Sequence, residues 1–237
     1  MCRFCLERRQ LIEAHIIPKS FFERIRTDEP NILVNESDYP KRSPQGVYDK
    51  GILCGRCDNT IGKWDQYAQE VLTMDMATFT TIVEQGIGNG AELSEYDYAK
   101  LKLFFISLVW RASISTHSFY AKVNIGSKFE EKALQMLKSD DPGDAHDFGV
   151  VIARFKEVQG HAFFDPHTER VNGLNQVRFY LAGYIVYMKV DQRPYNPDLA
   201  HFLLADGQPL RIIRRSIHKG GEAEVISKIL NAPKNKC

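Results

Sequence analysis

The stretch Leu53-Cys54-Gly55-Arg56-Cys57 has the same C-x-x-C spacing as Met1-Cys2-Arg3-Phe4-Cys5 at the amino terminus. A single C-x-x-C pair is found in redox proteins, but two pairs offer four thiolates, the ligand set of a tetrahedral structural zinc site. Four buried thiols without a metal are the alternative, which is disfavoured because the pairs enclose a segment poor in core residues. The sequence therefore predicts that Zn²⁺ binds Cys2, Cys5, Cys54 and Cys57.

The segment from Met1 to about Lys63 is rich in loops. Prolines and glycines interrupt its short apolar patches: Pro18, Pro30, Pro40, Pro44, Gly46, Gly51 and Gly55. Such a segment cannot close a hydrophobic core unaided, so we expect a bound metal to supply the missing cohesion.

The composition is that of an ordinary globular protein, with 237 residues, 43% hydrophobic and 26% charged. The formal net charge is +1, so any binding to a polyanion must come from a local patch rather than from the field of the whole molecule. No apolar run reaches the roughly 18 to 20 residues that span a bilayer. The amino terminus lacks the pattern of a secretory signal, and an odd fifth cysteine, Cys237, suits a reducing compartment, so we expect a cytoplasmic protein.

Hydrophobic periodicity predicts helices in the first half of the chain and strands in the second. One helix is expected to begin just after Cys57, with Asp58 as its N-cap, and to run to about Gln85, where Gly86–Gly90 joins it to the next helix. That second helix is expected to start near Ser94. Further elements are expected as a helix over Lys128–Lys138, strands over Phe148–Lys156, Val177–Val190, Ala200–Ala205 and Leu210–Arg214, and a last short helix over about Glu222–Leu230.

The order of the motifs, C-x-x-C, then Ala14-His15-Ile16-Ile17-Pro18, then Leu-Cys-x-x-Cys, resembles the HNH endonuclease superfamily over about Cys2 to Ala68. The resemblance implies a small ββα-metal core whose cysteines join two loops through zinc. The continuation Cys57-Asp58-Asn59-x-x-Gly62-Lys63-Trp64-Asp65 is similar to that of a bacterial subgroup of HNH-like proteins.

The resemblance also implies roles for individual residues. His15 matches the general base that activates water for attack on a phosphodiester, a task suited to a side chain that titrates near neutral pH. Asp58, directly after the fourth cysteine, matches a ligand of Mg²⁺ or Mn²⁺, with Asn59 as the alternative if the register shifts by one. Asp49 stands where the family has the asparagine that orients the catalytic histidine.

One family position differs in this chain. The residue before the catalytic histidine is usually Asp or His and binds the cation, but here it is Ala14, so a cation is held by one carboxylate unless Glu13 or another acid contributes. Among the neighbouring residues, Lys19 and Lys63 are expected to contact phosphate. Asp65, seven residues after Asp58 on nearly the same helix face, is expected to orient a neighbour.

The resulting expectation is an α+β protein with an N-terminal zinc-bound HNH-like ββα module, a helical middle and a mainly antiparallel C-terminal sheet. Residues 1–85 form the module with its long helix, and residues 86–237 form the C-terminal subdomain. The expected function is metal-dependent hydrolysis of nucleic acid, with DNA favoured over RNA. The alternative is a catalytically inactive zinc protein that binds nucleic acid or a protein partner, and the C-terminal region is also a place for a protein partner or a homodimer contact.

Plainer interpretations stay open for several residues. His15 is also suited to a structural role before Pro18, and Asp58 to a simple helix N-cap. Arg111 is expected to be buried beside an acid. The sequence has one dense cluster of basic residues, which comprises Arg211, Arg214, Arg215, His218 and Lys219. This cluster has two interpretations, a phosphate-contacting patch or a solvated strand edge.

Overall fold

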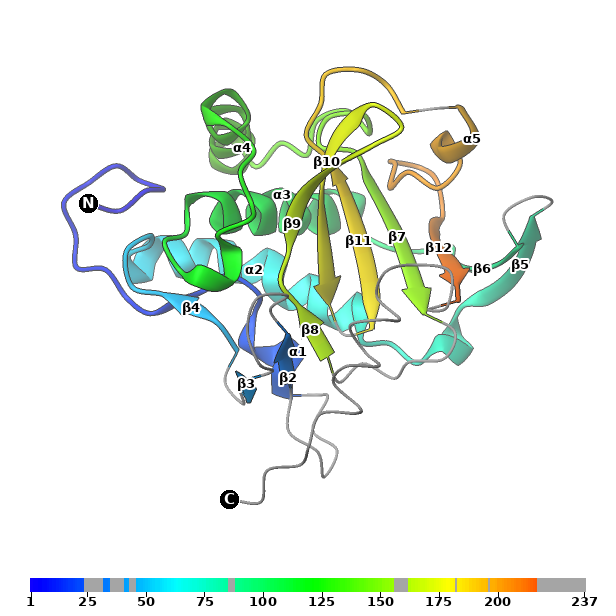
Figure 1. Ribbon diagram of the computed structural model, residues 1–237, viewed down its shortest axis with the longest axis horizontal. Coiled ribbons are helices and arrows are strands. Elements are labelled where there is room, and N and C mark those ends of the chain that lie inside the picture. Colours follow the sequence, from blue (N-terminus) through cyan, green and yellow to red (C-terminus); the bar gives the residue numbers. More distant parts are fainter. Residues whose placement is uncertain are drawn as a thin grey trace.

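The computed structural model describes most of the chain, namely residues 1–23, 32–34, 41–42, 46–84, 88–155, 162–181, 183–195 and 197–216. The expected helix over Glu222–Leu230 and the basic residues His218 and Lys219 lie outside the described residues. Figure 1 shows a broad sheet with two long helices packed across one of its faces. The architecture is α+β, as expected from the sequence.

The main sheet has seven strands in the order β5-β6-β12-β7-β11-β10-β9. Every neighbouring pair is antiparallel except β12 and β7, which run parallel. The strands are β5 (Thr80–Glu84), β6 (Gly88–Leu93), β7 (Val150–Phe155), β9 (His167–Val171), β10 (Leu174–Leu181), β11 (Tyr184–Lys189) and β12 (Leu210–Arg215).

Two smaller sheets lie near the amino terminus. The first is the antiparallel pair of β1 (Ala14–His15) and β4 (Tyr48–Asp49). The second consists of β2 (Ile32–Val34), β3 (Lys41–Arg42) and β8 (Ala162–Phe164).

The helices are α1 (Lys19–Glu23), α2 (Gly55–Leu72), α3 (Tyr98–Ile114), α4 (Ser127–Ser139) and α5 (Pro197–Ala200), with 3-10 turns at Met76–Thr78 and Ser118–Tyr120. Helix α3 is buried on all sides from Leu101 to Ala112, which fits its nearly continuous apolar sequence. Asp97 caps it by accepting a hydrogen bond from the Lys100 amide at 3.0 Å. Helix α3 is therefore the centre of the molecule, with α2 and α4 packed against it.

The larger hydrophobic core extends from the amino terminus to the main sheet. Phe4 packs edge-on against Trp110 of α3 at 5.9 Å between ring centroids, and Phe21 stacks on Phe104 of the same helix at 5.9 Å. A second cluster, around Val151 and Leu203, lies under the segment after β11. The expected boundary after residue 85 falls between β5 and β6, which pair with each other.

Three expectations about the first half of the chain are wrong. Helix α2 ends at Leu72 rather than near Gln85, because the run Thr80–Val83 is β-branched and forms β5 instead. Its N-cap is Cys54, so Asp58 lies within the first turn and does not cap it. Of the segment Gly86–Gly90, expected to join two helices, Gly88–Gly90 begin β6, and residues 85–87 lie outside the described residues.

The second half is closer to expectation. Helices α3 and α4, and strands β7 and β12, lie where the sequence placed them. The range Val177–Val190 is divided between β10 and β11, and the expected strand Ala200–Ala205 is wrong, since only a single bridge joins Leu203 to Val151. Strand β9 was not expected. Its turn into β10 is Asn172-Gly173, with both φ angles positive (50° and 79°), as a two-residue hairpin turn requires.

Candidate functional site

The four cysteines form one compact cluster. The sulfurs of Cys2, Cys5, Cys54 and Cys57 all lie within 4.8 Å of one another, and three of these residues are buried. Sulfurs bound to one tetrahedral Zn²⁺ at about 2.3 Å are about 3.8 Å apart, so small side-chain shifts suffice to surround the ion. Within the described ranges, this is the only group of three or more side chains that can hold a metal ion. The donor set fits a structural metal such as zinc.

The backbone around the cluster joins the two cysteine pairs. The Leu6 amide donates to the Cys2 carbonyl at 2.9 Å, with Leu6 in the left-handed region at φ 62°, so the first pair turns tightly. The Cys54 amide donates to the Cys2 sulfur at 3.4 Å, and the Arg3 amide donates to the Ile52 carbonyl at 2.8 Å. The amino terminus therefore lies directly against the loop that precedes α2.

The pKa values of two thiols in the cluster, Cys2 and Cys57, are shifted in opposite directions. Burial and the neighbouring sulfurs raise the pKa of Cys57. Burial also acts against ionisation of Cys2, but backbone amides of Cys5 and Cys54 outweigh it and lower its pKa to about 7. Cys57 therefore resists ionisation on its own, and a divalent cation bound to the cluster would favour its thiolate.

His15 lies on β1, next to strand β4. Its strand pairs with β4, His15 facing Tyr48, and the two rings are 5.9 Å apart. The imidazole is half-buried. The backbone carbonyl of His15 accepts a hydrogen bond from Arg111 of α3 at 2.8 Å.

Asp58 lies in the first turn of α2 and is half-buried, whereas its neighbour Asn59 is exposed. Burial raises the pKa of Asp58, and the charges of Arg111 and His15 oppose that rise. Asp58 is thus partly shielded from water, whereas Asn59 faces solvent.

Asp65 lies two turns after Asp58 on α2 and forms a two-pronged ion pair with Arg111. The oxygens of Asp65 accept from Nη1 at 2.9 Å and from Nη2 at 2.6 Å. The side chain of Arg111 is 1% exposed and that of Asp65 is 16% exposed. Burial raises the pKa of Asp65, and its two hydrogen bonds to the guanidinium oppose the rise. The expectation that Arg111 is buried beside an acid is confirmed.

Asp49 fixes the end of β4 to the end of α3. Its carboxylate accepts from the Gly51 amide at 2.6 Å, the Ser115 hydroxyl at 2.8 Å and the Thr116 amide at 2.7 Å. Burial disfavours the charge, but these hydrogen bonds outweigh it and lower the pKa of Asp49. Asp49 thereby holds the strand that pairs with β1.

The lowered pKa of Asp49 predicts a dependence of stability on pH. Its contribution is complete above the unfolded pKa of about 3.9 and is lost as the pH falls through the lower native value. We expect Asp49→Asn to reduce the free energy of unfolding by about 1 to 3 kcal/mol at pH 7. The difference between the two proteins should shrink as the pH falls below the unfolded pKa and through the lower native pKa, which urea unfolding at several pH values measures. A difference independent of pH would contradict this role.

The residues around His15 do not fit a tightly held Mg²⁺ or Mn²⁺. Ala14 offers no ligand, and Glu13 is exposed and paired with Lys50 at 2.8 Å. Both oxygens of Asp65 are bound to Arg111. Asp49 is engaged by Gly51, Ser115 and Thr116, so among these acids Asp58 is the carboxylate left. A hard cation held by a single carboxylate keeps most of its water. The expected catalytic cation has no support from the described donor set.

The two lysines expected to contact phosphate lie on α1 and α2. Lys19 is exposed at the start of α1. Lys63 is ion-paired with Asp140 at 2.7 Å, and its ammonium lies 4.8 Å from the centre of the Trp64 ring. Asp140, the residue that caps the end of α4, therefore partly neutralises the charge of Lys63.

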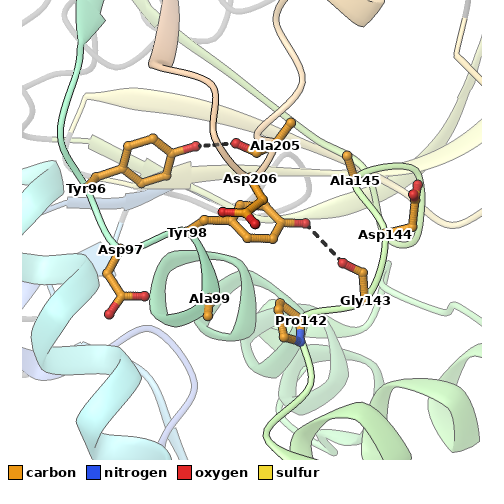
Figure 2. A pocket seen from close by; sticks show the side chains of 10 residues that line it. All are labelled: Tyr96, Asp97, Tyr98, Ala99, Pro142, Gly143, Asp144, Ala145, Ala205 and Asp206. Atoms are coloured by element: carbon orange, nitrogen blue, oxygen red, sulfur yellow. Dashed lines mark hydrogen bonds between the residues drawn. The ribbon is translucent and has the colours of Figure 1, made fainter.

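A cavity of about 630 Å³ lies at the other end of α3. Figure 2 shows its tyrosine walls, where the Tyr96 hydroxyl donates to the Ala205 carbonyl at 2.9 Å and the Tyr98 hydroxyl donates to the Gly143 carbonyl at 3.3 Å. It lies about 20 Å along the helix from Arg111, at 1.5 Å per residue. The charged residues that line the cavity are all acidic, namely Asp97, Asp144 and Asp206. The cavity is therefore unsuited to a polyanion such as nucleic acid.

Comparison with known proteins identifies no relative of this chain, since no protein-family model, no curated protein and no solved structure matches it. In the part of the chain that the structure describes, none of the helices combines the length and the apolar composition needed to cross a membrane. A function must therefore be argued from the residues themselves.

Sequence reasoning missed the partners that hold the site in place. Arg111 contacts the backbone of His15 from a position 96 residues further along the chain, and Ser115 and Thr116 contact Asp49 from positions 66 and 67 residues further along. No local spacing reports such contacts. The one usable signal was an arginine in a helix that is otherwise apolar.

Proposed function

We propose that this chain is a zinc-stabilised nuclease of the HNH type, which hydrolyses phosphodiester bonds of nucleic acid, DNA in preference to RNA. The observation that carries the proposal is the order of the elements beside the four-cysteine cluster. Strand β1 with His15 pairs with β4, and β4 is followed directly by α2, which carries Cys57 and Asp58 in its first turn.

In this proposal His15 accepts a proton from the attacking water, a role for which an imidazole is suited near neutral pH. The charge of Asp58 stabilises the imidazolium that forms, as a carboxylate does in other histidine-dependent hydrolases. The cysteine cluster maintains the geometry by holding the amino terminus against the start of α2. Each of these steps uses residues of this chain alone.

The second candidate is a zinc protein that binds nucleic acid or a protein without cleaving it. Two observations favour it: Ala14 is buried where the family has a cation ligand, and Asp65 is fully engaged by Arg111. It predicts binding without product formation.

A cleavage assay of the wild type beside His15→Ala separates the two candidates. Single-stranded and duplex DNA and RNA are incubated with Mg²⁺, with Mn²⁺ and with EDTA. We expect His15→Ala to lose about 10² to 10⁴-fold in rate, the usual contribution of a general base. His201→Ala serves as the control, because His201 is an exposed histidine far along the chain.

The nuclease proposal fails if the wild type cleaves none of these substrates. It fails equally if His15→Ala and wild type cleave at the same rate, because the activity then does not depend on His15. Binding of the same substrates without products would favour the second candidate.

A further inference from the structure

Arg111 contacts two elements of the proposed site at once. Its Nη1 donates both to the His15 carbonyl at 2.8 Å and to Asp65 at 2.9 Å, and its Nη2 donates to Asp65 at 2.6 Å. Its Nε donates to the Ser107 carbonyl one turn earlier at 3.3 Å. The guanidinium is buried, so these bonds are shielded from water and restrict its orientation strongly.

Strand β1 needs such support because it is only two residues long. It pairs with β4 at Ala14 and His15, and beyond this pairing the Ile16 amide is 3.5 Å from the Val47 carbonyl, a weak hydrogen bond. A charge-assisted bond to the His15 carbonyl is stronger than either kind of contact. The backbone that carries the imidazole is thus held from α3 as well as from β4.

We propose that Arg111 is the positioning residue of His15. Anchored to Asp65 of α2, it fixes the carbonyl of His15, and through the backbone it sets where the imidazole lies relative to Asp58. The catalytic part of this inference rests on the proposed nuclease function. A lysine at this position keeps the positive charge but has a single terminal nitrogen, which cannot reproduce the planar fork that joins Asp65 and the carbonyl.

The test compares Arg111→Lys with Ser107→Ala and with wild type. Ser107 lies one turn before Arg111 on α3, and its buried hydroxyl has no hydrogen-bond partner among the described residues, so alanine should be tolerated. Zinc content and thermal unfolding establish that each protein is folded. Asp65→Asn, which keeps the size of the side chain, serves as a second variant if Arg111→Lys does not fold.

Hydrogen exchange of residues 13–17 is the first measurement. We expect Arg111→Lys to raise their exchange by about tenfold or more through local opening, while Ser107→Ala leaves it unchanged. Cleavage kinetics is the second. We expect kcat to fall about 100-fold with KM nearly unchanged, because a displacement of about 1 Å affects the reaction more than binding. If Arg111 only stabilised the fold, a folded Arg111→Lys protein would not show a lower kcat with an unchanged KM.

The inference is overturned if folded, zinc-loaded Arg111→Lys shows wild-type exchange over residues 13–17, or if its loss of activity lies in KM alone. A wild type that cleaves nothing removes the proposed nuclease function. The exchange result then still decides whether Arg111 fixes the backbone of His15, so the two failures are distinguishable.

Discussion

Cys54→Ser is expected to release the metal and unfold the amino-terminal part of the protein. Cys54 is both a zinc ligand candidate and the N-cap of α2, and its amide contacts the Cys2 sulfur. Because the free energy of zinc binding is folding free energy in such modules, we expect a loss of at least about 5 kcal/mol, which lowers Tm by about 10 to 20 °C in a chain of this size. Elemental analysis and thermal unfolding by circular dichroism measure both effects.

Cys237→Ser is the matched control, since it removes the one cysteine that is not part of a C-x-x-C pair. It should keep the zinc content and the Tm of wild type. Chelation of wild-type protein should reproduce the Cys54→Ser phenotype, and restoring Zn²⁺ should reverse it. A Cys54→Ser protein with wild-type stability would contradict a structural role for the cluster.

Asp65→Ala is expected to destabilise the protein by about 3 to 5 kcal/mol, because it leaves the buried Arg111 guanidinium without its partner. The loss is larger than that of an ordinary surface pair, since the uncompensated charge remains in a site shielded from water. Urea unfolding at pH 7 measures the change. The zinc content should stay at the wild-type value, because Asp65 is not one of the four residues that can hold the zinc.

Lys63→Ala provides the comparison on the same helix. Lys63 pairs with Asp140 at the surface, where both side chains are about half exposed, and such pairs contribute between about 0 and 1 kcal/mol. Equal effects of Asp65→Ala and Lys63→Ala would contradict the view that the Arg111 pair is buried and supports the site.

The sequence predicted those features that depend on local spacing. Two C-x-x-C pairs indicated the metal cluster, and the hydrophobic periodicity after Ser94 indicated the central helix, α3. These features are decided by neighbours in the chain, so a single sequence is enough to find them.

Features decided by distant packing were missed or misplaced. The strand β5 reads as a continuation of α2 until its pairing with β6 is known. The interpretation of the basic residues around Arg211 as a strand edge is wrong, since β12 lies between β6 and β7 inside the sheet. There Arg211 is paired with Glu92 at 3.1 Å, an interaction that the sequence alone does not reveal.

The identity and ligands of the bound metal test the account most directly. X-ray absorption at the zinc edge, with elemental analysis of the purified chain, should show one zinc per chain surrounded by four sulfurs at about 2.3 Å. A folded protein that contains no zinc, or a zinc ion with nitrogen or oxygen ligands in place of one of the four cysteines, would contradict it.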